Sequence, residues 1–419
     1  MKQLTILFAV CISSLSAAQN VMTPEMLWQL GRVSGLGITE DNASVVYRVS
    51  TPVVSQNSSI VKYYSLPVGG GAPKELTATN ELLADRSVSP DGQYKVLIKE
   101  VKVQKVFGKD FYPQLDKSDV QIYESLNYRH WDEWEDGIYN HLFVRNMVTG
   151  EEVDIMKGEH YDCPQKPFGG DEDYTWSPDS KSLLYVTKKK AGTAYAMSTN
   201  TDIFQYDITT RKTSNLTQGI LGYDTQPQFS KTGTLAWLSM KRDGYESDKN
   251  DIVVKTSAGM RNLTSEWDGT VNGFQWSLDG TQIFFNAPVD GTIQLFQVAA
   301  EGGAVVQITK GDFDITGMVG QVGNQMIVTR TDMNHAAELY SVNLKTGESA
   351  QMTYVNDATY KQIKLSKVER KYMTTTDNQK MLTWIIYPPD FDPSKKYPTL
   401  LYCQGGPQSA LSQFYSYRW

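Results

Sequence analysis

The sequence predicts an all-β propeller with six visible blades, and a seventh blade is left as an open alternative. Three observations favour this fold: a turn phrase that recurs along the chain, the spacing of its copies, and a second phrase that closes each unit. The composition, 40% apolar and 21% charged over 419 residues, is that of a globular protein. The 11% of aromatic residues supplies enough core material to exclude a disordered chain.

The recurring phrase is a Ser-Pro-Asp-Gly-like turn followed by a short apolar strand. Its copies begin at residues 39, 89, 177, 230, 277 and 322, and four of the five intervals lie between 45 and 53 residues. Asp-Gly pairs favour the positive φ angles of hairpin turns, and a period of about 40 to 50 residues is typical of four-stranded blades. The long interval holds an insertion over residues 104–141. A stack of β-sandwiches is the alternative, but the single dominant period favours the propeller.

A second phrase, an apolar residue followed by threonine, ends the strand set of most units. Its copies are Leu76-Thr77, Leu216-Thr217, Leu263-Thr264, Ile308-Thr309 and Met352-Thr353. Because it stands at the same place in each unit, it marks the end of a blade.

Residues 1–18 have the pattern of a signal peptide. Lys2 precedes an apolar stretch from Leu4 to Leu15, and small residues up to Ala18 form a cleavage site. We therefore expect cleavage after Ala18, export across the inner membrane and a periplasmic location; a buried first strand is the alternative. Neither this stretch nor any later one is long and apolar enough to predict stable membrane insertion.

The mature chain divides into three predicted parts. Residues 19–35 form an N-terminal helical segment, in which Thr23 caps a helix that begins with Pro24. The propeller occupies residues 36–360. Residues 361–419 begin a further domain, with strands at 367–373 and 380–387 and a buried apolar strand at 397–402 before a glycine-rich break.

Charge and cysteine content exclude several functions. With 40 Lys+Arg against 47 Asp+Glu, the net charge of -7 argues against nucleic acid as a partner. Cleavage of the signal peptide leaves Cys163 and Cys403, which form neither a disulfide framework nor a metal site. We expect no metal and no organic cofactor.

Three motifs, in this order, resemble the prolyl oligopeptidase family: residues 130–134 (His-Trp-Asp-Glu-Trp), 242–248 (Arg-Asp-Gly-Tyr-Glu-Ser-Asp) and 401–408 (Leu-Tyr-Cys-Gln-Gly-Gly-Pro-Gln). The resemblance extends from about Thr23 to Trp419. In that family a propeller caps an α/β-hydrolase domain, so it implies that residues 361–419 are the first strands of an incomplete α/β-hydrolase domain. It also implies a serine exopeptidase that releases dipeptides from the N-termini of short peptides, with a homodimer as an open alternative for the full-length protein.

One part of the family pattern is missing. The nucleophile motif Gly-x-Ser-x-Gly does not occur, and all four histidines precede residue 336. We therefore expect that the chain is truncated at its C-terminus, that the Ser-His-Asp triad lies beyond Trp419, and that this chain alone is inactive.

The resemblance assigns roles to residues that are present. Gly405 and Gly406 correspond to a loop that supplies a backbone N–H to the oxyanion hole; a plain tight turn is the alternative. Acids and aromatics of the first two motifs are the candidates for holding the peptide and its α-ammonium: His130, Trp131, Asp132, Glu133, Trp134, Arg242, Asp243, Tyr245 and Glu246.

Structural interpretations of these candidates remain open. The insertion can pack on the propeller through its tryptophans with its acids in solvent, and Arg242 can form an internal Arg–Asp pair. We interpret the acids Asp162, Asp171, Glu172 and Asp173 as a solvated loop, since they lack the spacing of a calcium loop. A non-catalytic propeller that binds peptides or proteins is the alternative function, and a relic of gene decay is a weaker one.

Overall fold

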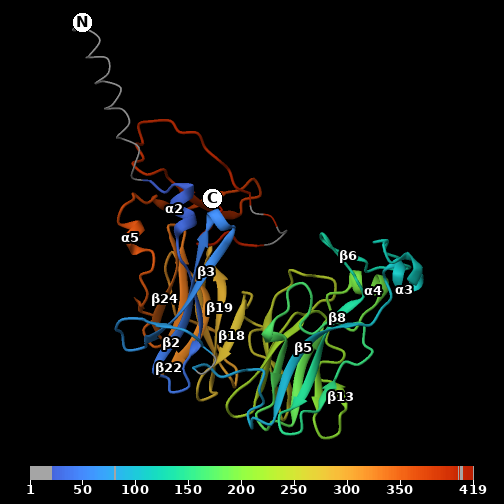
Figure 1. Cartoon of the computed structure of the whole chain (residues 1–419). Helices are drawn as coiled ribbons and strands as arrows, with labels where there is room; N and C mark the ends of the chain where they lie inside the picture. The colour runs from blue at the N-terminus through green and yellow to red at the C-terminus, as the bar shows by residue number, and fades with distance from the viewer. Residues whose placement is uncertain (1–20, 80–81, 404, 406–408, 419) are drawn as a thin grey trace, which may run out of the picture. The chain divides into compact units, whose positions relative to one another are not determined.

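The computed structural model describes residues 21–79, 82–403, 405 and 409–418 (Figure 1). The predicted signal peptide and Gly406 therefore lie outside the described residues. The chain forms two compact units: unit 1 comprises residues 1–83, 288–295 and 307–419, and unit 2 comprises residues 84–287 and 296–306. Among the described residues, no helix is long and apolar enough to cross a membrane.

Six small antiparallel sheets make up the blades within the described part of the chain, and the predicted propeller has that number. Each follows chain order, so every blade is a contiguous meander. The sheets are β1 (Arg32–Ile38), β2 (Ser44–Val53), β3 (Ser58–Pro67) and β4 (Lys74–Leu76); β5 (Tyr94–Lys102), β8 (Ile138–Asn146) and β9 (Glu152–Asp154); β10 (Tyr174–Trp176), β11 (Ser182–Thr187), β12 (Asp202–Asp207) and β13 (Thr213–Asn215); β14 (Asp224–Phe229), β15 (Leu235–Ser239), β16 (Asp251–Thr256) and β17 (Gly259–Asn262); β18 (Gly273–Trp276), β19 (Gln282–Val289), β20 (Thr292–Ala299) and β21 (Val306–Gln307); and β22 (Asp314–Val322), β23 (Gln325–Asp332), β24 (His335–Asn343) and β25 (Ser349–Gln351). In the second blade, a single bridge from Val88 to Lys95 takes the place of the first strand.

The recurring turn phrase joins the first and second strands of a blade through a short hydroxyl–carboxylate bond. The hydroxyl of Ser277 donates to Asp279 Oδ1 at 2.6 Å and accepts the Gln282 N–H at 2.9 Å. Ser89 and Asp91 repeat the first contact at 2.6 Å. Hydrogen bonds from Ser277 and Thr281 lower the pKa of Asp279 to about 2. The serine and the aspartate are therefore the chemical reason for the repeat that the sequence displays.

The threonine of the second phrase ties the fourth strand to the third. Thr309 Oγ1 accepts the Leu295 N–H at 2.9 Å and donates to Gln294 Oε1 at 2.8 Å, with the threonine 1% exposed. Thr353 makes the same two contacts with the Leu339 N–H and the Glu338 carboxylate, at 2.8 and 2.5 Å. A threonine at this position satisfies a buried backbone donor that the short fourth strand leaves open.

The first and last blades pack together within unit 1. Val33, Val49, Ile327 and Leu339 belong to one buried apolar cluster. The backbones approach closely at Gly35, because a Cβ there would lie 2.2 Å from Val319 Cγ2. The two blades share no strand, so side-chain packing alone joins them.

The predicted N-terminal helix is confirmed as α2 (Pro24–Gln29), with the Thr23 hydroxyl accepting the Met26 N–H at 3.2 Å. Asn356 then fixes the chain that follows the helix. Its side chain accepts the Gly31 N–H and donates to the Gly31 carbonyl, both at 2.8 Å and both buried. These two bonds connect residues 325 positions apart in the sequence.

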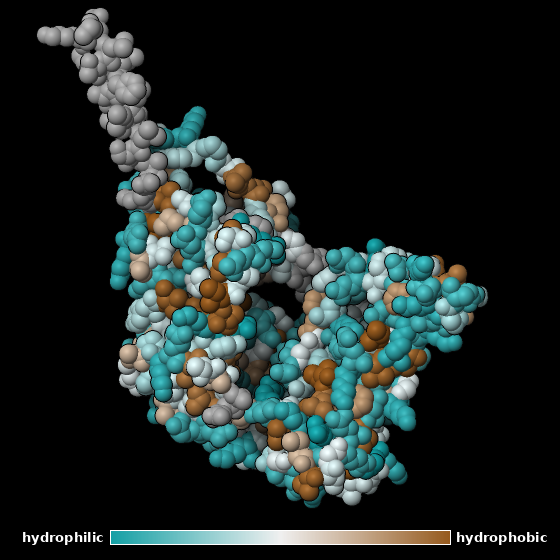
Figure 2. Space-filling model, in the orientation of Figure 1, coloured by the Kyte–Doolittle hydropathy of each residue, from teal (hydrophilic) through white to brown (hydrophobic). Residues whose placement is uncertain are grey.

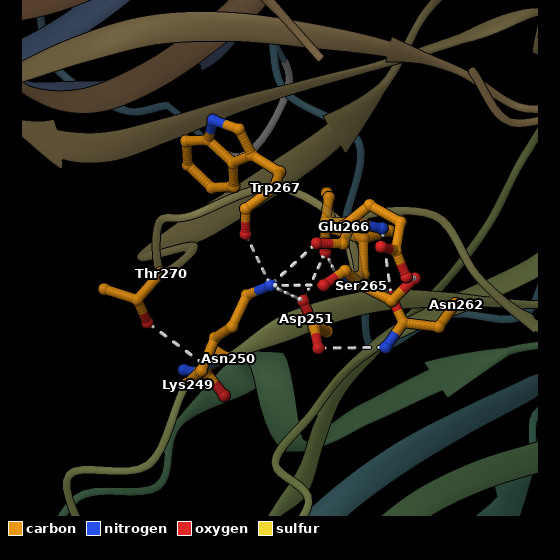
Figure 3. A network of polar contacts seen from close by, with 10 residues as sticks. Lys249, Asn250, Asp251, Asn262, Ser265, Glu266, Trp267 and Thr270 are labelled. Carbon is orange, nitrogen blue, oxygen red and sulfur yellow. Dashed lines mark hydrogen bonds and ion pairs between the residues drawn. The ribbon is translucent and has the colours of Figure 1, made fainter. Parts of the chain in front are cut away.

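Lys249 organises the end of the fourth blade in unit 2 (Figure 3). Its ammonium donates to the carbonyl oxygens of Thr264, Ser265 and Trp267 at 2.7, 3.2 and 2.6 Å, and it lies 3.0 Å from Asp251 Oδ1. The Trp267 ring packs on Phe285 and Phe296, each with centroids 5.3 Å away. A lysine thus holds a loop in the way that a bound cation would.

After the propeller, two predicted strands are confirmed as the hairpin β26 (Val368–Thr374) and β27 (Lys380–Ile386). The predicted strand at 397–402 is wrong: the segment has no regular structure, and Leu400 and Leu401 are 98% and 82% exposed. An apolar strand needs hydrogen-bonded neighbours, and the described residues provide no partner strand here. Elsewhere, the face visible in Figure 2 is mainly hydrophilic, with separate hydrophobic patches.

Candidate peptide-binding site

Three connections between second and third strands gather in unit 2. They are residues 103–137 in the second blade, 188–201 in the third and 240–250 in the fourth. Because each joins the same two strands of its blade, all three leave the same end of their sheets. Direct contacts link the last two connections, since the Gly244 N–H donates to Thr199 Oγ1 at 2.9 Å. The insertion approaches α4 (Gly192–Met197), where a Cβ on Gly192 would lie 3.5 Å from the Leu126 carbonyl oxygen.

The insertion contains a small hairpin of β6 (Arg129–His130) and β7 (Glu133–Trp134), which carries the first predicted motif. Its two-residue turn is Trp131-Asp132, with Trp131 at a φ of 50°. All five motif residues are exposed, and Trp131 and Trp134 are 67% and 51% exposed. The predicted carboxylates Asp132 and Glu133 thus lie in solvent, as the alternative interpretation of the insertion has it.

Two aromatic clusters surround this hairpin. Tyr123, Tyr128 and Trp134 form one, with ring centroids 5.7 to 6.0 Å apart. Trp131 forms the other, 4.8 Å from the His130 ring and 5.3 Å from the ring of Phe168, which is 73% exposed. The hairpin therefore presents apolar rings to solvent, a surface suited to apolar side chains of a ligand.

Two less exposed carboxylates lie beside the hairpin, and the sequence analysis missed both as site residues. Glu135 accepts from Asn127 Nδ2 at 3.1 Å, and Asp162 Oδ1 accepts the Asn140 N–H at 2.7 Å. Burial raises the pKa of both carboxyls, and the charge of Asp162 adds to the effect at Glu135. Burial, with the charges of both acids, raises the pKa of Tyr139 to about 12. The site thus concentrates negative charge that Lys166, 3.7 Å from Asp162, only partly offsets.

The interpretation of residues 162 and 171–173 as a solvated loop is wrong for two of the four acids. The side chain of Asp162 is 12% exposed. Asp173 is 3% exposed overall, and its carboxylate accepts the Gln165 N–H at 2.8 Å. Burial raises the pKa of Asp173 to about 7. Spacing along the chain could not show this, because these acids are covered by strands distant in sequence.

The second predicted motif forms a self-contained loop. Arg242 donates to Asp248 Oδ1 from Nε and Nη2, at 3.2 and 2.9 Å, and stacks 4.2 Å from the centroid of the Tyr245 ring. This is the internal Arg–Asp pair of the alternative interpretation, with Asp248 as the partner.

Asp243 links the loop of the second motif to the neighbouring blade. Asp243 Oδ1 accepts from the Ser198 hydroxyl and the Thr199 N–H at 2.7 and 2.8 Å. Asp243 and Glu246 favour the charged form of Lys188, but burial is larger and lowers its pKa. The predicted substrate ligands Arg242 and Asp243 therefore already have partners, whereas the side chain of Glu246 contributes negative charge near Lys188.

The third predicted motif can be described only in part. Gly405 is exposed, and no atom lies within 4 Å of the position that a Cβ there would occupy. In the part of the chain that the structure covers, no group of three or more His, Cys, Asp or Glu residues could hold a metal ion.

The chain matches no model of a known protein family. It is 36% identical over 449 residues to dipeptidyl-peptidase 5 of Porphyromonas gingivalis, a match that covers 95% of this chain and 65% of that protein. Dipeptidyl-peptidase 5 of Porphyromonas endodontalis is 34% identical, with 96% and 65% covered. The chain thus spans about 65% of the length of these relatives.

Solved structures show the same fold. An acylaminoacyl peptidase of Pyrococcus horikoshii matches with a TM-score of 0.69 at 13% identity, over 95% of this chain and 64% of that one. Dipeptidyl peptidase 4 of Porphyromonas gingivalis matches with a TM-score of 0.52 at 12% identity, over 93% and 62%. The predicted fold class and the predicted resemblance are confirmed.

Proposed function

Because the chain is homologous to the dipeptidyl-peptidase 5 proteins of the prolyl oligopeptidase family, we propose that it is the propeller-bearing part of an exported serine exopeptidase. That enzyme releases dipeptides from the N-termini of short peptides. A serine attacks the scissile carbonyl, a histidine carries the proton and an aspartate orients the histidine. This chain contains no Gly-x-Ser-x-Gly motif, so the triad comes from sequence beyond Trp419 and this chain alone is inactive. Gly405 and Gly406 belong to the loop that supplies an oxyanion-hole N–H.

An exopeptidase of this type must recognise a free α-ammonium, and the observation that carries the proposal is the pair of Glu135 and Asp162. Both carboxyls have raised pKa values because they are removed from water while lying near other negative charge. A bound ammonium would relieve this repulsion and favour the ionised form of both groups. The exposed acids Asp132 and Glu133 gain less, since water already solvates them.

The neighbouring rings suit the side chains of the first two peptide residues. Trp131 and Trp134 expose large apolar surfaces beside the carboxylates, and burial of such surface contributes about 25 cal/mol per Å². Tyr245, which is 53% exposed, extends the aromatic surface in the neighbouring blade. In this arrangement Arg242 and Asp243 position the loop that carries Tyr245 and Glu246.

Peptide binding to this chain tests the proposal without requiring catalysis. We expect a tetrapeptide with a free N-terminus to bind more tightly than its N-acetyl form in calorimetric titrations. Since a charge-assisted hydrogen bond contributes about 1.5 to 3 kcal/mol, Glu135→Gln and Asp162→Asn should each weaken binding about 10- to 100-fold. Glu172→Gln, at an exposed acid elsewhere in unit 2, is the matched control.

The outcomes separate the competing assignments. Equal affinity for the acetylated peptide would remove the ammonium anchor from this site. Loss of binding with Glu133→Gln but not with Glu135→Gln would move the anchor to the exposed hairpin. Tight peptide binding by a full-length product that lacks peptidase activity would favour the non-catalytic binding module.

Export is a separate part of the proposal. The signal-peptide pattern of residues 1–18 supports cleavage after Ala18 and a periplasmic protein. N-terminal sequencing of the protein recovered from the periplasm should begin at Gln19. Recovery of the uncleaved chain from the cytoplasm would contradict it.

A further inference from the structure

Unit 1 contains a cavity of about 470 Å³ beside the last blade. It is lined by residues of β23 and β24 and by α5 (Asp357–Tyr360), the short helix that follows the propeller. None of the motifs that carry the proposed peptide-binding site contributes to it. Cavities of this size hold small organic ligands when a few polar groups converge on them.

Arg330 is the cation whose position defines the cavity. Its guanidinium carbon lies 3.7 Å from the centroid of the Phe313 ring and 4.6 Å from that of Tyr340. Nη1 donates to the neutral hydroxyl of Ser349 at 2.8 Å. Within the described part of the chain, no carboxylate forms an ion pair with Arg330. Aromatic rings that cover the faces of a guanidinium leave its in-plane N–H donors for an acceptor, and a carboxylate matches that geometry.

Acids of the same cavity differ in what they already bind. Glu338 accepts from Thr353 and from the Asn356 N–H, and Asp332 accepts from His335 Nδ1 at 2.9 Å. Asp357, at the start of α5, makes no side-chain hydrogen bond or ion pair among the residues described. The lining therefore offers one cation and one anion that are each without an ionic partner.

Mixed charge distinguishes this cavity from a simple anion site. A free carboxylate alone would meet Arg330 but would also meet the charges of Asp332 and Asp357. A ligand with a carboxylate at one end and an ammonium at the other satisfies both signs at once. A free dipeptide has this chemistry and a size that the cavity volume accommodates.

We propose that the cavity binds a free dipeptide as a zwitterion, with the carboxylate on Arg330 and the α-ammonium on Asp357. The choice of a dipeptide rests on the proposed function, since dipeptides are the products of that reaction. Product released by the peptidase would then be a ligand of the propeller itself.

Titration of the chain with alanylalanine tests the proposal. We expect saturable binding that weakens at least tenfold for N-acetyl-alanylalanine, which lacks the ammonium, and for alanylalanine amide, which lacks the carboxylate. Arg330→Gln and Asp357→Asn should each weaken binding of alanylalanine at least tenfold. Arg370→Gln is the matched control, because Arg370 is a guanidinium of the same unit that stacks on Trp384 and already pairs with Asp312.

Each outcome bears on the proposal. Absence of saturable binding, or equal binding of the two blocked dipeptides, would overturn it. Should Arg330→Gln fail to fold in thermal melts, the exposed edge of the cavity at Asp357 still allows Asp357→Asn to decide. The measurement needs no catalysis, so a negative result leaves the peptidase assignment intact, and an inactive full-length enzyme would leave dipeptide binding intact.

Discussion

Replacement of Lys249 by methionine should destabilise unit 2 by about 2 to 4 kcal/mol. The change keeps the apolar stem but removes an ammonium that donates to three carbonyl oxygens and lies 3.0 Å from Asp251. Each hydrogen bond to a charged group contributes about 1.5 to 3 kcal/mol. The lysine side chain is 32% exposed, so water can replace part of what is lost, and we count one to two such bonds.

Thermal unfolding followed by circular dichroism and tryptophan fluorescence measures this effect. For a unit of roughly 200 residues, 1 kcal/mol corresponds to about 2 to 4 °C, so we expect Tm to fall by roughly 4 to 16 °C. Trp267 reports locally, because its carbonyl is one of the acceptors. Lys255→Met, at an exposed lysine of β16 in the same blade, is the control and should change Tm by less than about 2 °C. A Tm for Lys249→Met equal to that of the control would refute the reasoning.

Three further predictions concern buried polar groups. Burial raises the pKa of Asp224 from 3.8 to about 7, so the folded protein holds a proton that the unfolded chain releases. The resulting stability is complete below about pH 4 and is lost as the pH rises through about 7; Asp224→Asn should flatten this fall by up to about 1.4 kcal/mol per pH unit in urea unfolding at pH 5, 6 and 7, and an unchanged slope would contradict the prediction. Thr309→Val should cost about 1 to 3 kcal/mol, since it leaves the Leu295 N–H without its acceptor, whereas Thr309→Ser should cost less than about 1 kcal/mol; equal melting of the two variants would argue against the hydroxyl. Asn356→Ala should expose the segment before Gly31 to proteolysis several-fold faster, because two buried hydrogen bonds hold it; unchanged digestion kinetics would show that other contacts are sufficient.

The blades were predictable because each is a local unit with its own chemistry. The turn at Ser277 and Asp279 and the closing Thr309 form bonds within about 15 residues, so their traces repeat in the sequence. The same locality explains why α2 could be predicted from its cap and its proline.

The candidate site was less predictable because its electrostatics depend on long-range packing. The hairpin motif pointed to the right insertion, but the low exposure of Asp162 results from its contact with Asn140, 22 positions away. Glu135 directly follows the motif, and the acidic run around Trp134 was the available signal. The cavity at Arg330 has no sequence signature, since its lining comes from two strands and a helix of four residues.

The expected strand at 397–402 shows the opposite limit. Its apolar composition is real, but composition cannot supply the neighbouring strands that a sheet requires. Leu400 and Leu401 are consequently left in solvent among the described residues.

The packing of the first blade on the last has a consequence for the order of folding. Val33 and Val49 are synthesised almost 300 residues before Ile327 and Leu339, their partners in one apolar cluster. Until the last blade has emerged, these valines have no native cover on that side, and no shared strand aligns the two blades beforehand. Contacts so distant in sequence form slowly, because the loop that they close is long. Docking at Gly35 and Val319 should therefore be a late step, and the edge of the first blade is the surface that a nascent chain must keep from aggregating.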